Sequence, residues 1–109
     1  MSLDSLFMQC VVALGEVELN EAYIKKDEAN TRFYGLQEPG RVWVNPVTAV
    51  VDYLLHEMIH EVKPEWPEAT VASMTTRLMH KLTDSQIKEF YQIYQDRKIV
   101  RAQTIDANS

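Results

Sequence analysis

The amino-acid sequence predicts an α+β fold in which a small antiparallel sheet packs on helices. Residues 18–45 contain short aromatic and β-branched runs separated by turn residues, which is typical of strands. Residues 46–97 instead carry apolar side chains at helical spacing, interrupted by prolines. A length of 109 residues is enough for one modest core, so we expect residues 1–109 to form a single domain.

The first expected element is a short helix over residues 4–14, with Asp4 as a plausible N-cap. Its apolar side would consist of Leu6, Phe7, Cys10, Val11 and Leu14. Cys10 is the single cysteine of the chain, so it cannot form an internal disulfide. Because it lies in the apolar run CVVAL, we expect a buried and unreactive thiol.

Two or three antiparallel strands are expected next, at AYIKK (residues 22–26), TRFYGL (31–36) and RVWVN (41–45). The turn-forming segments DEAN and QEPG separate them. The third run alternates well, with Val42 and Val44 on one face and Trp43 on the other.

Three helices complete the chain. Asn45 and Pro46 open the first, which runs to about Val62 and is ended by Pro64. The second starts at Glu68 and continues to about residue 82. The third opens with a capping box formed by Thr83 and Gln86, and its apolar stripe consists of Ile87, Phe90, Tyr91 and Tyr94.

Residues 56–60, with the sequence HEMIH, carry the most specific signal in the chain. On a helix that advances about 100° per residue, His56 and His60 lie about 40° apart and project to the same side. Two neutral imidazoles in this arrangement can share one zinc ion, and Glu57 can reach a water at that ion without being a ligand. The alternative interpretation is a solvated helix face whose histidines have no function.

The neighbours of the motif are mostly apolar, so we expect this helix to be central and buried. They are Val50, Val51, Leu54, Leu55, Met58 and Ile59. Polar groups on a buried helix need partners, and a zinc ion would provide one.

A catalytic zinc site normally has three protein ligands, so a third must come from outside residues 56–60. The candidates are Glu65, Glu68 and His80. By helical phase His80 lies about 120° from Glu68, on the side expected to face solvent. The short turn after the first helix should fold the second helix back beside it and bring Glu68 near the histidines. We therefore predict Glu68 as the third ligand, with Glu65 as the alternative.

Further residues have both a functional and a structural interpretation. Asp52, one turn before His56, could orient that imidazole or simply face solvent. The strand at residues 41–45 could pair with an extended substrate or be a routine sheet strand. Tyr91 and Tyr94 could stabilise an oxyanion, although their apolar stripe favours core packing.

The segment RVWVNPVTAVVDYLLHEMIHEVKPEWPEATV resembles the core of small HExxH zincin metallopeptidase-like proteins of the kind found in phages and prophages. The resemblance extends over residues 41–82, and its HExxH portion is the specific part. It implies a zincin-like minimal core, with an active-site helix under a small sheet. It also implies that zinc is held by His56, His60 and a downstream acid, here matched by Glu68, and that Glu57 is the general base.

Composition excludes several classes of partner. The net charge of -5 argues against nucleic acid, which requires a basic face. The longest unbroken apolar run, residues 10–14, is far too short for a membrane span. The first residues have no basic segment before their apolar stretch, so they do not resemble a secretory signal, and a cytoplasmic location is expected.

The function expected from these features is that of a zinc-dependent metallopeptidase acting on a peptide or protein substrate. Glu57 would take a proton from the attacking water and pass it to the leaving amine. The alternative is a non-catalytic zinc-binding domain, or a protein-interaction module, that retains the HExxH site for stability.

Overall fold

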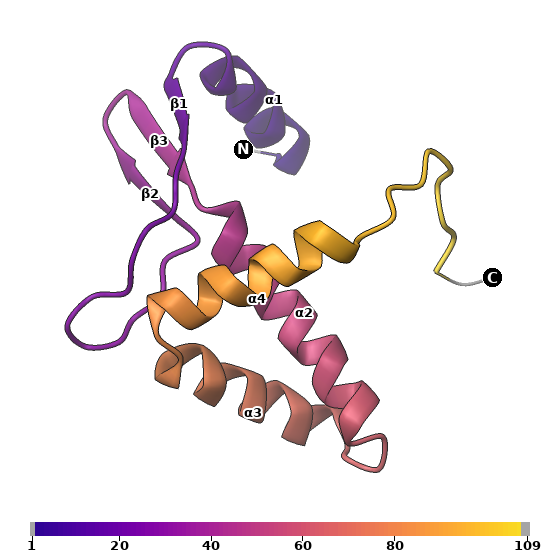
Figure 1. Cartoon of the computed structure of the whole chain (residues 1–109). Helices are drawn as coiled ribbons and strands as arrows, with labels where there is room; N and C mark the ends of the chain where they lie inside the picture. The colour runs from indigo at the N-terminus through magenta and orange to yellow at the C-terminus, as the bar shows by residue number, and fades with distance from the viewer. Residues whose placement is uncertain (1, 108–109) are drawn as a thin grey trace.

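The computed structural model describes residues 2–107, which form four helices and three strands (Figure 1). The elements are α1 (Leu3–Leu14), β1 (Glu18–Glu21), β2 (Gly35–Glu38), β3 (Arg41–Val44), α2 (Pro46–Val62), α3 (Glu68–Lys81) and α4 (Asp84–Arg97). The α+β class, with a small sheet accompanying helices, is confirmed. None of the helices in the described residues has the length and apolar character needed to cross a membrane.

The core lies among α2, α3 and α4, and α3 and α4 both contact α2 (Figure 1). Buried residues of α2 recur every three or four positions, at Thr48, Val51, Leu55 and Ile59. Val51 and Leu55 form the core cluster together with Met79 of α3 and Ile87 of α4. The apolar periodicity thus places α2 at the centre, as expected, but Met58 is 43% exposed, so the expected burial is wrong at this position.

Local capping explains where two of the helices begin. At α2, the Asn45 side chain accepts a hydrogen bond from the backbone amide of Thr48. At α4, the Thr83 hydroxyl accepts from the Gln86 amide, and the Gln86 side chain accepts from the Thr83 amide. Both caps satisfy amides that have no partner inside the helix, and both were predicted correctly.

The sheet has the strand order β1-β3-β2. β2 and β3 form the expected antiparallel hairpin, whose turn has Gly40 at a φ of 80°. Glycine adopts this backbone conformation readily, and proline before it favours such a turn. β1, however, pairs parallel to β3, so the prediction of a purely antiparallel sheet is wrong at this pair. The long connection over residues 22–34 allows β3 to insert between β1 and β2.

The predicted strand at residues 22–26 is also wrong, because β1 lies earlier, at residues 18–21. Residues 22–34 instead form a loop that passes the turn between α3 and α4 (Figure 1), where Lys26 and Arg32 donate to the Leu82 carbonyl. Tyr23 packs against the helical core, which explains its apolar character without a strand.

Asn45 joins the sheet to the helices. Its side-chain amide is buried and donates to the backbone carbonyls of Ile24 and Phe33, at 3.3 and 2.9 Å, and to the Thr48 hydroxyl at 2.8 Å. Asn45 therefore fixes both sides of the 22–34 connection to the start of α2.

Asp84, at the start of α4, forms a second anchor for the same connection. Its carboxylate accepts from the Tyr23 hydroxyl at 2.6 Å and from the Lys26 amide at 3.2 Å, and it pairs with Arg32. The Arg32 side chain is only 5% exposed and also donates to the carbonyls of Met79 and Leu82. Burial and the Asp84 hydrogen bond raise the pKa of Tyr23 to about 12.

Helix α1 stands apart from the helical core (Figure 1), and every residue of it is exposed. The prediction of a buried thiol is wrong, because Cys10 is exposed. Ser2 rather than Asp4 caps the helix, since the Ser2 side chain accepts from the Ser5 amide. The Ser2 cap satisfies one amide of this helix, but no described element covers its apolar side chains.

Candidate metal centre

Helix α2 presents His56 and His60 on the face beside its buried stripe. The side chains are 23% and 33% exposed, so they are reachable from solvent but held by their surroundings. Their ring centroids lie 4.9 Å apart with an interplanar angle of 70°. The four-residue spacing therefore brings the two imidazoles into direct contact, as helical geometry predicts.

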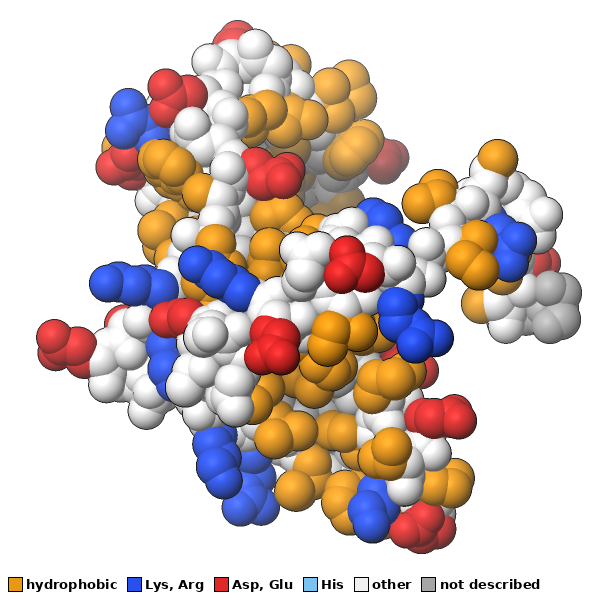
Figure 2. Space-filling model, in the orientation of Figure 1, with side chains coloured by type: hydrophobic (Ala, Val, Ile, Leu, Met, Phe, Trp, Pro, Cys, Tyr) orange, Lys and Arg blue, Asp and Glu red, His pale blue; other side chains and the backbone are white. Residues whose placement is uncertain are grey.

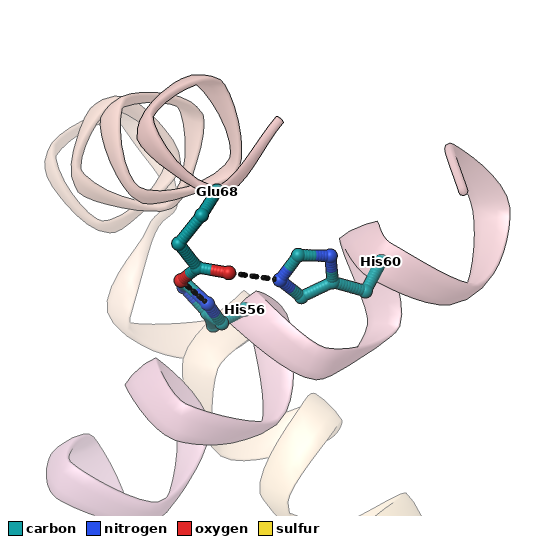
Figure 3. A group of neighbouring side chains, drawn as sticks. All are labelled: His56, His60 and Glu68. Carbon is teal, nitrogen blue, oxygen red and sulfur yellow. Dashed lines mark hydrogen bonds and ion pairs between the residues drawn. The ribbon is translucent and has the colours of Figure 1, made fainter. Parts of the chain in front are cut away.

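Glu68 reaches the two histidines from the first turn of α3 (Figure 3). Its Oε1 lies 2.6 Å from Nε2 of His56, and its Oε2 lies 2.7 Å from Nε2 of His60. Each imidazole donates one hydrogen bond to the carboxylate. The hydrogen bond from His60 lowers the pKa of the Glu68 carboxyl, desolvation opposes this, and the His56 charge lowers it further.

The turn between α2 and α3 makes this contact possible. Lys63 ends α2, and its carbonyl accepts from the Trp66 amide at 3.0 Å, so the chain reverses within a few residues. Pro67 occupies the N-cap of α3 and provides no side-chain cap. A carboxylate in the first turn is favoured at such an end, because the amides there carry partial positive charge.

The three side chains form a group that could hold a metal ion, because their ligand atoms all lie within 4.8 Å of one another. Around an ion with bonds of about 2.0–2.1 Å in tetrahedral geometry, ligand atoms stand about 3.3 Å apart. The Glu68 oxygens lie closer to the imidazoles than this, so the carboxylate must withdraw by about 0.6 Å. Glu68 is 69% exposed and has room to do so.

The other two candidates for a third ligand lie outside this group. Glu65 is exposed in the turn before α3. His80 is exposed near the opposite end of α3, where its backbone carbonyl accepts from the Lys26 side chain at 3.4 Å. The structure therefore brings Glu68, and neither alternative, to the histidine pair.

Glu57 is exposed and is not a member of the metal-binding group. It lines an open hollow of about 300 Å³ together with Asp52, Tyr53 and His56. Glu57 and His56 therefore line the same solvent-accessible hollow. That arrangement is compatible with a base beside the metal, and the catalytic role of Glu57 stays a prediction.

The proposed orienting role of Asp52 is not supported. Its carboxylate accepts a hydrogen bond from the Tyr34 hydroxyl rather than from His56, and Asp52 is partly buried rather than fully in solvent. Burial and then the Asp52 hydrogen bond raise the pKa of Tyr34 above its usual range. The pair ties the start of the β2–β3 hairpin to the helix that carries the histidines.

The hypothesis that residues 41–45 pair with an extended substrate is wrong. These residues include β3, which lies in the middle of the sheet and pairs with β1 on one side and β2 on the other. Its backbone is already paired on both sides, so no edge is open for a further strand.

Tyr91 and Tyr94 differ in position. Tyr91 packs against the core cluster, and its hydroxyl accepts from the Gln95 side chain. Tyr94 lines a groove with Leu54 and Glu57 on the side of α2 that faces α4. Core packing is thus the right interpretation for Tyr91.

Two residues near the site were not predicted from the amino-acid sequence. Tyr53 borders the hollow beside Glu57, and its position one turn before that residue on the same helix could have revealed it. Tyr34 reaches the site region through Asp52 from a distant segment, and no local pattern signals such a contact.

Comparison of the chain with family models, with curated proteins and with solved structures gave no match.

Proposed function

We propose that this protein is a zinc-dependent metallopeptidase whose metal is held by His56, His60 and Glu68. The observation that carries the proposal is the convergence of two imidazole nitrogens and one carboxylate on a common point. Imidazole ligands favour zinc over calcium and magnesium, which prefer all-oxygen sites. Two histidines and a glutamate leave one position free in a tetrahedral site, as catalysis requires.

In this proposal the chemistry is divided between the metal and one carboxylate. Zinc at such a site supplies a Lewis acid that acidifies water and polarises a carbonyl. Glu57 takes a proton from the attacking water and delivers it to the leaving amine. Its place on the hollow that His56 also lines gives it access to both solvent and substrate.

A second candidate is a non-catalytic zinc domain. Its support is that Glu68 joins α2 and α3 across the short turn, so a metal there would fasten the two helices together. A structural role needs the three ligands but does not need Glu57. The two candidates therefore differ at one residue.

The deciding experiment is metal analysis and peptide hydrolysis with the wild type and Glu57→Gln. A peptidase will contain about one zinc per chain in both proteins and lose hydrolysis only in the variant. A zinc domain without activity will bind zinc in both proteins and cleave none of a broad peptide panel. A wild type that binds no transition metal at neutral pH would rule out both candidates.

The ligand set is tested separately by zinc affinity. Glu68→Ala should weaken binding strongly, because a histidine pair alone holds zinc poorly. Glu65→Ala and His80→Ala are matched controls and should change affinity little. Acidification should release the metal, because protonated imidazole cannot bind it. Full affinity in Glu68→Ala would remove this residue from the site.

A further inference from the structure

Helix α1 is apolar around most of its circumference. Among its twelve residues only Asp4, Ser5 and Gln9 are polar. Phe7 is 66% exposed, and every other residue of the helix is exposed as well. A helix of this composition is normally buried against other elements, so we expect another surface to cover it.

A second apolar surface lies on the helical region, between α2 and α4. Leu54 and Met58 of α2 and Phe90, Ile93 and Tyr94 of α4 line a groove of about 490 Å³. Hydrophobic side chains gather over these helices in Figure 2. This groove adjoins the groove that Tyr94 lines with Leu54 and Glu57, because Leu54 and Tyr94 line both grooves. We call it the α2–α4 groove.

The exposed area of the chain exceeds that of a typical folded monomer. Its accessible surface is 8643 Å² for a mass of 12.6 kDa, whereas a compact monomer of that mass exposes about 6,200 Å². The radius of gyration is 17.0 Å against about 13 Å for a compact domain of this length. Extended residues after α4 account for part of the excess. The apolar side chains of α1, all of them exposed, contribute to it as well.

Charge also matches between the two surfaces. The polar end of the α2–α4 groove carries Arg97 and Lys98. The only charged residue within α1 is Asp4. An acidic helix end placed beside a basic groove end is electrostatically favourable.

We propose that α1 of one copy of this chain packs in the α2–α4 groove of a second copy, and that the exchange is reciprocal. Within residues 2–107 each chain presents this uncovered helix and this uncovered groove, so a two-fold dimer covers both at once. Within one chain α1 lies beside the sheet, away from the helical region (Figure 1), so its own groove stays open. The dimer is independent of the proposed peptidase activity.

The first test is the mass of the protein in solution by sedimentation equilibrium. The wild type is expected at twice 12.6 kDa, and Phe7→Asp and Ile93→Asp are each expected at 12.6 kDa. Leu36→Asp is the matched control, because Leu36 is 47% exposed on β2, outside both surfaces, and this variant should remain dimeric. Circular dichroism will show that each variant retains its helices.

Several results would overturn the proposal. One is a monomeric wild type, including one that floats with phosphatidylcholine vesicles, since that would assign α1 to a lipid surface. Another is a dimer that survives both Phe7→Asp and Ile93→Asp. Loss of the dimer in Leu36→Asp as well would place the interface on the sheet instead.

Crosslinking identifies which helix occupies which groove. Cys10 is the only cysteine, so a second one can be introduced at Leu54, Met58 or Ile93 in turn. Mild oxidation should link Cys10 to at least one of these positions between two chains and give a reducible dimer. The wild type, with Cys10 alone, is the control. Linkage within one chain, or no linkage at any of the three positions, would contradict the exchange.

Discussion

The helical region, residues 46–97, and the N-terminal region, residues 2–45, bury their side chains very differently. Among the described residues, every fully buried apolar side chain belongs to the helical region. Among the described residues of the N-terminal region, only Asn45, which is polar and lies at the junction, is buried as a whole, and the side chain of Arg32 is 5% exposed. The helical region is therefore stabilised by its own core, whereas the N-terminal region is held by strand pairing and by polar anchors at Asn45 and Asp84.

This contrast explains where the candidate metal centre lies. A site that must hold three ligand atoms within a few ångströms needs elements whose positions are fixed by packing. His56 and His60 follow Leu55 and Ile59 of the buried stripe, and Glu68 precedes the buried Val71 on α3. Among the described residues, the contribution of the N-terminal region at the border of the site is the Tyr34–Asp52 contact.

Because the two regions differ in burial, a core substitution should cost far more stability in the helical region than a substitution on the sheet. Ile87→Ala removes a fully buried side chain of α4 and should lower the free energy of unfolding by about 2–5 kcal/mol. Leu36→Ala, on the exposed face of the N-terminal region, should change it by less than about 0.5 kcal/mol. Urea unfolding followed by circular dichroism measures both. Equal losses would mean that the two regions share their stability.

Metal binding should stabilise the helical region in particular, because the proposed ligands all belong to it. Zinc at a hundredfold excess over its dissociation constant should stabilise the wild type against unfolding by about 2.7 kcal/mol. Glu68→Ala should lose most of this increment and Glu65→Ala should retain it. The measurement is urea unfolding with and without zinc. An equal increment in Glu68→Ala would show that zinc stabilises the fold elsewhere.

The next largest loss of stability is expected at Asn45, which joins the N-terminal region to the helical region. Asn45→Ala removes the cap of α2 and leaves the carbonyls of Ile24 and Phe33 without their donor, which should cost about 2 kcal/mol. Hydrogen exchange should accelerate in residues 22–34 while α3 and α4 keep their protection. Gln92→Ala, whose side chain donates to Asp96 on the exposed face of α4, is the control. Unchanged exchange in residues 22–34 would contradict the anchoring role.

The smallest expected change in stability depends on pH and concerns Asp84, the second anchor of residues 22–34. Burial alone would raise the pKa of Asp84, but hydrogen bonds from Tyr23, Lys26 and Arg32 together hold it below its ordinary value. A lowered pKa in the folded state means that ionised Asp84 stabilises the fold above the ordinary carboxyl pKa and that this contribution disappears as the pH falls through the folded value.

We therefore expect Asp84→Asn to be less stable than the wild type by about 1 kcal/mol at neutral pH. The difference should shrink below about pH 4, where carboxyl groups titrate. Glu89→Gln, at an exposed position of α4, is the control and should change the free energy of unfolding by less than about 0.5 kcal/mol. A stability gap between Asp84→Asn and the wild type that is independent of pH would exclude the ionised form as the source of stability.

The sequence alone predicted the helical region well because its signals are local. The Asn45 cap, the Thr83–Gln86 capping box and the apolar spacing of α2 each involve residues within a few positions of one another. The same local geometry places His56 beside His60. Glu68 could be predicted because the turn before α3 is too short to separate the two helices widely.

The structure of the N-terminal region depends on tertiary contacts, because these contacts join residues far apart in the chain. The central place of β3 depends on the path of residues 22–34, and strand alternation cannot distinguish a parallel from an antiparallel neighbour. Exposure of Cys10 likewise depends on what covers α1, which its own apolar pattern does not specify. Local sequence determines caps, turns and helix faces. Strand order and long-range polar contacts such as Tyr34–Asp52 depend instead on how distant segments of the chain pack together.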